Sequence, residues 1–156
     1  MDNSEVARLL DQVADLLEIS GDTNPFRIRS YRIAAEAIEA HGEPVGAMDE
    51  AALKDRLGVG AGMAARIQEI VATGDCAARK KLLEEVPPGL LELLKISGLG
   101  PKGVQKVWRG LGVCSADDLL ATIDDGRFVT LPGMGKKKAE RIRRGIERLK
   151  EKSSDR

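Results

Sequence analysis

Three short segments of the sequence combine paired glycines with the start of a helix, an arrangement that can bind an anion. They are Leu57–Gly60, Ile96–Gly100 and Leu131–Gly135, and each has an apolar residue between two glycines. Glycine adopts backbone angles closed to other residues and has no Cβ to hold a ligand away. The helix that follows begins with N–H groups that lack an intrahelical partner, at the positive end of its dipole. Each segment is therefore a candidate backbone clamp for phosphate, which contacts no base edge and reads no sequence.

The repetition of this turn favours a phosphate clamp over a simple tight connection between two helices. One copy alone would fit both interpretations equally. The first glycines of the three copies lie 40 and 35 residues apart. Lysines follow the second and third copies, and a cation beside a helix N-terminus opposes the dipole unless an anion binds there. Ala61 and Gly62 follow the first copy, so we expect the first clamp to be the weakest. The candidate phosphate-binding residues are Gly58, Val59, Gly60, Gly98, Leu99, Gly100, Lys102, Gly133, Met134, Gly135, Lys136, Lys137 and Lys138.

Charge is distributed unevenly along a chain that is neutral as a whole. Residues 1–56 carry 6 basic and 12 acidic side chains, whereas residues 95–156 carry 15 basic and 8 acidic ones. This excess of basic residues in the C-terminal third indicates a polyanionic partner, although a solvated helix face would have the same composition.

Composition favours an all-α fold, because the chain is 42% hydrophobic but only 3% aromatic and strands favour aromatic and β-branched residues. No apolar run is long enough to span a membrane, and no secretion signal opens the sequence, so we expect a cytoplasmic protein. Cys76 and Cys114 are expected to be reduced and mostly buried. A single histidine, His41, excludes a site built from several histidines, and its place suggests a helix C-terminal cap.

Hydrophobic periodicity and turn residues place the helices that must position these segments. The first expected helix contains Val6–Leu17, and the others span about 25–41, 49–57, 61–73, 76–85, 89–95, 101–111, 115–124 and 135–150. Phe128–Thr130 is too short to form a sheet. Pro87–Gly89 is the clearest boundary, so we expect one helical module over 1–86, a second over 87–150 and a flexible tail over 151–156.

Several motifs together resemble the N-terminal part of bacterial family X DNA polymerases. They are Asn24–Ala35 (NPFRIRSYRIAA), the first glycine turn, Ile67–Ile70 followed by Thr73-Gly74, and the two later turns in Leu93–Lys102 and Leu131–Lys136. The resemblance implies a lyase-like helical bundle with one helix-hairpin-helix motif, followed by a tandem helix-hairpin-helix domain. It implies non-sequence-specific binding to duplex, gapped or nicked DNA in repair or replication, at the bacterial nucleoid. A polymerase or nuclease subunit is a further implied partner.

Two departures from this family argue against catalysis. The sequence ends where the metal-binding palm of the polymerase would begin, so we do not expect nucleotidyl transfer. Arg66 occupies the position of the lysine that attacks the abasic sugar, and a guanidinium is no amine nucleophile. Arg27, Tyr31 and Lys54 match other positions of the family's 5′-phosphate pocket, which is therefore expected over Arg27, Tyr31, Lys54 and Arg66. Arg27 and Tyr31 would equally fit a partly buried tyrosine covered by an arginine stem.

Two alternatives to simple DNA binding remain open. One is a lyase acting on abasic or deoxyribose-phosphate ends through a relocated lysine, for which Lys54, Lys80 and Lys81 are the candidates. The other is a protein-interaction module that has lost DNA binding. No organic cofactor is implied, but in the family hairpin carbonyls hold Na⁺ or K⁺ against the phosphate. The matching carbonyls belong to Leu94, Ile96 and Leu99, and to Lys54, Arg56 and Val59.

Overall fold

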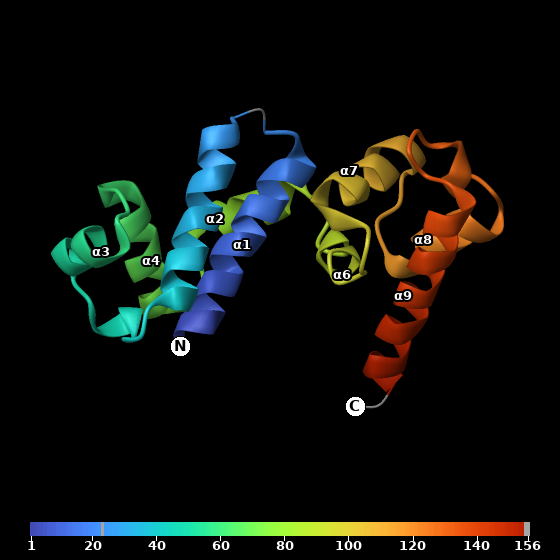
Figure 1. Cartoon of the computed structure of the whole chain (residues 1–156). Coiled ribbons are helices and arrows are strands. Elements are labelled where there is room, and N and C mark those ends of the chain that lie inside the picture. Colours follow the sequence, from blue (N-terminus) through green and yellow to red (C-terminus); the bar gives the residue numbers. More distant parts are fainter. Residues whose placement is uncertain (23, 155–156) are drawn as a thin grey trace. The chain divides into compact units, whose positions relative to one another are not determined.

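The computed structural model describes residues 1–22 and 24–154, and within these ranges the regular structure is entirely helical (Figure 1). The α-helices are α1 (Asn3–Ser20), α2 (Pro25–Ala40), α3 (Glu50–Leu57), α4 (Ala61–Thr73), α5 (Ala77–Glu85), α6 (Leu90–Leu93), α7 (Gly100–Leu111), α8 (Ala116–Asp124) and α9 (Lys136–Ser154). Two 3-10 turns lie at Val45–Ala47 and Phe128–Thr130. The all-α class is confirmed. No helix of the described residues is long and apolar enough to cross a membrane.

The chain divides into two compact units after Glu85, next to the proline-rich boundary. In the N-terminal unit α1 packs along α2, and α4 and α5 pack against α1. Side chains cap the N-termini of both long helices of this unit: the Asp2 carboxylate accepts the Glu5 N–H, and the Asn24 side chain caps α2 ahead of Pro25. The core is aliphatic, with Leu10, Leu16, Ile38, Leu53, Ile67 and Ile70 all fully buried.

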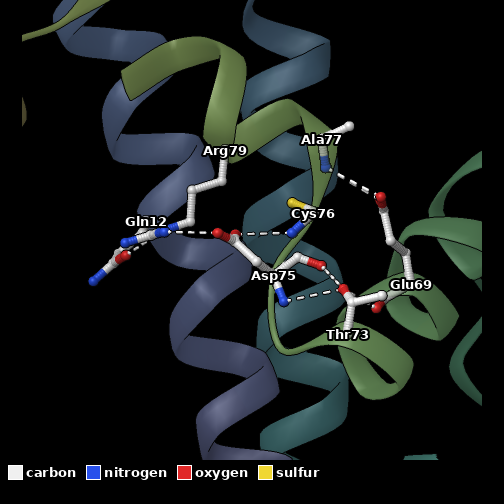
Figure 2. Close-up of polar contacts among 7 residues, drawn as sticks. All are labelled: Gln12, Glu69, Thr73, Asp75, Cys76, Ala77 and Arg79. Atoms are coloured by element: carbon white, nitrogen blue, oxygen red, sulfur yellow. Dashed lines mark hydrogen bonds and ion pairs between the residues drawn. The ribbon is translucent and has the colours of Figure 1, made fainter. Parts of the chain in front are cut away.

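The turn between α4 and α5 is fixed by side chains rather than by a glycine alone (Figure 2). The Glu69 carboxylate accepts the Ala77 N–H that begins α5, at 3.3 Å, and Asp75 accepts the Cys76 N–H at 2.8 Å. Arg79 links this turn to α1, because it donates to Asp75 at 3.1 Å and to Gln12 at 2.9 Å. These contacts set the orientation of α5 against α1 and therefore of the lysines that α5 carries.

The C-terminal unit is built from two helix-hairpin-helix units that pack into each other in a reciprocal way. In α7, the position of a Cβ on Gly110 lies 2.8 Å from Leu131, which leads into the third glycine bend. In α9, the position of a Cβ on Gly145 lies 2.8 Å from Ile96, which leads into the second bend. Gly110 and Gly145 both stand ten residues after the second glycine of their own turn. Each helix thus uses a glycine to admit the apolar residue of the other hairpin.

Two features differ from the sequence-based expectation. α9 continues to Ser154, past the expected end at 150, because no glycine or proline follows Gly145; residues 155–156 of the expected tail lie outside the described residues. Cys76 is buried as expected, but Cys114 is exposed, which corrects the prediction for that residue. The reason is that Val113, 1% exposed, takes the core position at the end of α7.

Replacement of Gly145 by alanine is expected to destabilise the C-terminal unit. Alanine favours a helix interior by about 1 kcal/mol over glycine. The added methyl would overlap Ile96, however, and overpacking costs about 1–3 kcal/mol. We expect a net loss of about 0–2 kcal/mol in the free energy of unfolding, measured by denaturation followed through Trp108, the only tryptophan. Glu147→Ala, at an exposed position of the same helix, is the control and should change stability by about 0.5 kcal/mol or less. A clear stabilisation by Gly145→Ala would contradict the close packing.

Candidate nucleic-acid interface

All three glycine bends lie on the surface, with their flanking glycines exposed. The first glycine of each bend, Gly58, Gly98 and Gly133, has a φ of 70°, 91° and 79°. This left-handed conformation is strained for other residues, so the glycines are required by the turn itself. The backbone at each bend is therefore open to a ligand.

The apolar residue between the glycines fixes two of the bends more firmly than the other. Leu99 is 5% exposed and Met134 is 4% exposed, so each is inserted into the core of the C-terminal unit. Val59 at the first bend is only half-buried. The second and third bends are thus the better-anchored ones.

The helices that follow the bends begin without the side-chain caps found elsewhere in the chain. Four other helices have their first N–H groups bonded by a side chain, namely those of Asp2, Asn24, Asp49 and Ser115. By contrast, neither Gly60 before α4 nor Leu99 before α7 makes a side-chain cap, and Gly135 before α9 has no side chain. In α9 the first intrahelical bond runs from the Ala139 N–H to the Gly135 carbonyl at 2.9 Å, which leaves the three lysine N–H groups before it without an intrahelical acceptor.

The lysines beside the second and third bends remain available to an anion. Lys102, Lys136 and Lys137 are exposed and Lys138 is half-buried. In the described residues none of the four makes an ion pair, although other cations of α9 do: Arg143 pairs with Asp124, and Arg144 lies 3.7 Å from Glu140. Cationic charge is therefore left uncompensated at the bends and compensated further along the helix.

Two further cations reach the bends from a distance in sequence, and neither is among the candidate phosphate-binding residues predicted for the bends. Arg141 of α9 lies beside Gly98, and Lys106 of α7 lies beside Gly133. The signal available in the sequence was their common register, since each stands six residues after the second glycine of its own turn.

The carbonyls expected to hold a monovalent cation lie at the same bends. The Lys54 carbonyl accepts the Gly58 N–H at 3.1 Å, and the Ile96 carbonyl accepts the Leu99 N–H at 3.4 Å. A carbonyl oxygen has two lone pairs, so one hydrogen bond leaves room for a cation. The donor set is compatible with Na⁺ or K⁺, which prefer oxygen ligands.

The expected 5′-phosphate pocket is assembled in part. Arg27, Tyr31 and Arg66 line one cleft of about 620 Å³ in the N-terminal unit, and the Arg66 guanidinium carbon lies 5.7 Å from the centre of the Tyr31 ring. Lys81 of α5 lines the same cleft, whereas Lys54 of α3 is exposed and is not among its lining residues. Asp22 also lines it and forms an ion pair with Arg27 at 2.9 Å.

Tyr31 reports on the electrostatics of this cleft. Its side chain is buried against the helices, and this burial raises the pKa of Tyr31 above the ordinary value of a phenol, while Arg66 and, more weakly, Arg27 act to lower it. The cleft therefore contains cationic charge close to a largely desolvated hydroxyl.

Asp118, in the first turn of α8, has a structural role. The Asp118 carboxylate accepts the Cys114 N–H at 3.1 Å while its own N–H donates to the Ser115 hydroxyl, which closes the N-terminus of α8. Among the described residues, no group of three histidine, cysteine, aspartate or glutamate side chains could hold a metal ion.

Comparison with known proteins finds a similar family for each unit. A helix-hairpin-helix domain model matches residues 1–76, and a SAM-like helix-hairpin-helix tandem model matches residues 90–148. The chain is 35% identical over 142 residues, 91% of its length, to the DNA polymerase/3′-5′ exonuclease PolX of Bacillus subtilis (strain 168), and covers 24% of that protein. Over 51 residues, 33% of the chain, it is 43% identical to the Holliday junction branch migration complex subunit RuvA of Acidovorax sp. (strain JS42) and of Aromatoleum aromaticum. The chain thus spans about a quarter of the length of these relatives.

Removal of the Arg66 charge is expected to raise the pKa of Tyr31 further. The guanidinium stabilises the phenolate, so the Arg66→Ala variant should deprotonate Tyr31 at higher pH than the unmodified protein does. Tyr31 is the only tyrosine, so an ultraviolet absorbance titration measures its pKa directly. Arg56→Ala, on exposed α3 outside the cleft, is the control and should leave the titration unchanged. An unchanged pKa in Arg66→Ala would show that the ring and the guanidinium are not close.

Proposed function

We propose that the chain binds DNA through the phosphate backbone without reading sequence. It belongs to the helix-hairpin-helix family, in the form found in the N-terminal portion of bacterial family X DNA polymerases. The names of its relatives, a DNA polymerase and a Holliday junction subunit, support a nucleic-acid partner. The setting that we propose is DNA repair or replication at the nucleoid in the bacterial cytoplasm, with a polymerase or nuclease as partner.

The observation that carries this proposal is the combination of exposed glycine bends, uncapped helix N-termini and lysines without ion pairs. Backbone N–H groups at a helix start donate to a phosphate oxygen, and the dipole favours its negative charge. Both interactions are made with the sugar-phosphate strand and not with base edges. The binding is therefore expected to depend strongly on salt and weakly on sequence.

The second and third bends are the principal clamps in this proposal. They have buried anchors at Leu99 and Met134 and lysines at the helix starts, whereas the first bend has neither feature. Na⁺ or K⁺ held by the carbonyls of the bends would add positive charge against the phosphate. The cleft lined by Arg27, Tyr31 and Arg66 is the proposed site for a 5′-phosphate, which would favour gapped or nicked DNA over intact duplex.

The glycines immediately before α4 and α9 provide a matched pair of test positions. A Cβ at Gly60 or at Gly135 would meet no atom within 4 Å, and neither glycine has a positive φ. Valine at either position should therefore fold, at a similar cost of about 1 kcal/mol for a poor N-cap. Its side chain would stand in the path of a phosphate approaching the helix start.

Gly135→Val is expected to weaken binding to duplex DNA about tenfold, since one charge-assisted contact contributes about 1.5–3 kcal/mol. Gly60→Val is expected to change it much less. Binding is measured by fluorescence anisotropy over a range of salt concentrations, where the log–log slope should be about −0.9 per neutralised phosphate, for roughly 3–6 phosphates. Equal affinities for the two variants would contradict the assignment of the clamps. The absence of any DNA binding at low salt would favour a protein-interaction module instead.

A second function is favoured by the position of Lys81. This lysine lines the cleft that also holds Arg27, Tyr31 and Arg66, so it is the one of the three candidate lysines placed to act as an amine nucleophile. Lyase chemistry at an abasic end begins when a neutral lysine amine attacks the sugar aldehyde and loses water to form a Schiff base. The proposal is that Lys81 performs this attack in place of the family's lysine.

Borohydride reduction tests this second function, because it converts the Schiff base into a stable covalent adduct with DNA. If Lys81 is the nucleophile, an adduct forms with DNA that carries an abasic 5′ end and is lost in Lys81→Gln. Lys80→Gln, at the neighbouring lysine that is exposed like Lys81 but is not among the cleft residues, should retain it. No adduct with the unmodified protein, or an adduct that survives Lys81→Gln, would rule out this role for Lys81.

A further inference from the structure

Each hairpin of the C-terminal unit places a basic side chain, as well as an apolar one, against the other hairpin. A Cβ on Gly98 would lie 3.1 Å from Cδ of Arg141 and 3.7 Å from its Nη1, although Arg141 belongs to the helix of the third hairpin. A Cβ on Gly133 would lie 3.7 Å from Nζ of Lys106, which belongs to the helix of the second hairpin. Each exposed bend thus has a cation from the other hairpin beside it.

The register of these two cations is the same. Lys106 stands six residues after Gly100, and Arg141 stands six residues after Gly135. Six residues rise about 9 Å along a helix, so each cation lies well beyond the amides at the start of its own helix. The glycine contacts at Gly110 and Gly145 have the same reciprocal pattern. This indicates that the placement of each cation beside the bend of the other hairpin follows from how the two hairpins pack.

Neither cation is neutralised within the described part of the chain. Lys106 and Arg141 are exposed and make no ion pair there, whereas Arg143 and Arg144, the next cations of α9, are paired with acidic side chains. A cation held against an exposed backbone bend is unfavourable beside the positive end of a helix dipole unless an anion joins it.

The first hairpin has a cation in the same register but uses it differently. Arg66 stands six residues after Gly60, and this hairpin has no paired hairpin within its unit. Its guanidinium lies over Tyr31 and lines the cleft of the N-terminal unit. The cation six residues after the second glycine therefore lies against the element that packs on its helix. In the C-terminal unit this element is the bend of the other hairpin.

We propose that Arg141 completes the phosphate clamp at Gly98–Gly100 and that Lys106 completes the clamp at Gly133–Gly135. This inference rests on the proposed DNA binding and specifies which side chain serves which bend. A phosphate oxygen at each bend would be bound by main-chain amides of one hairpin and by a side chain of the other. The two clamps would then depend on each other, since neither hairpin alone supplies all of the contacts to the phosphate at its bend.

The test is a DNA titration of Arg141→Gln and Lys106→Gln followed by NMR of the glycine amides. In the unmodified protein, duplex DNA should shift the amides of Gly98, Gly100, Gly133 and Gly135. Arg141→Gln should reduce the shifts at the second bend and spare the third, and Lys106→Gln should do the reverse. Each variant should lower affinity about threefold to tenfold and flatten the salt slope by about 0.9. Arg144→Gln, which removes the same charge from a paired residue of α9, should retain shifts at both bends.

The possible outcomes separate this inference from the function on which it rests. The assignment of Arg141 and Lys106 to the bend of the other hairpin is overturned, while DNA binding stands, in either of two cases. In one case each variant loses the shifts at the bend of its own hairpin, and in the other neither variant changes the shifts. If the unmodified protein shows no DNA-induced shift, both are overturned.

Discussion

The arrangement of the molecule depends on one constraint: the first N–H groups of an α-helix need acceptors that the helix cannot provide. The chain meets this need with side chains at α1, α2, α3 and α8, through Asp2, Asn24, Asp49 and Ser115. At α4, α7 and α9 a glycine bend precedes the helix instead, and no side chain caps the first N–H groups. Burial of Leu99 and Met134 holds two of these bends in place, so the open amides are set by the core. Phosphate is the ligand whose geometry and charge this constraint favours.

The two units use the same turn in different surroundings. In the C-terminal unit two copies pack on each other, and glycines at Gly110 and Gly145 allow the close approach. In the N-terminal unit the single copy packs among the helices of a bundle, and Arg66 is turned toward Tyr31 and the cleft that Lys81 also lines. One local sequence thereby provides exposed bends with uncapped helix N-termini in one unit, and in the other it contributes an arginine to a cleft that Arg27, Lys81, Asp22 and Glu85 also line.

Much of this fold could be predicted from local sequence. Capping residues and glycines lie at the helix ends, since α2 begins after Asn24 and α4 ends before Gly74, at the predicted positions 25 and 73. His41 is the C-cap of α2, also as predicted. Local rules could not place Lys81 in the cleft, because its position depends on how Asp75 and Arg79 fix α5 against α1 (Figure 2). They also could not assign Lys106 and Arg141 to opposite bends, because contacts between residues 27 and 43 positions apart are determined by packing and not by spacing.

The most direct test of the central claim is amide hydrogen exchange at the bends in the presence and absence of duplex DNA. Amides that donate to phosphate are protected from exchange, whereas lysine side chains that merely attract DNA leave the backbone exposed. The account predicts that DNA selectively slows exchange at 98–100, 102–103 and 133–138, and much less at 116–130. If DNA binds while exchange at the two bends is unchanged, the phosphate is not held by the backbone and the account is wrong.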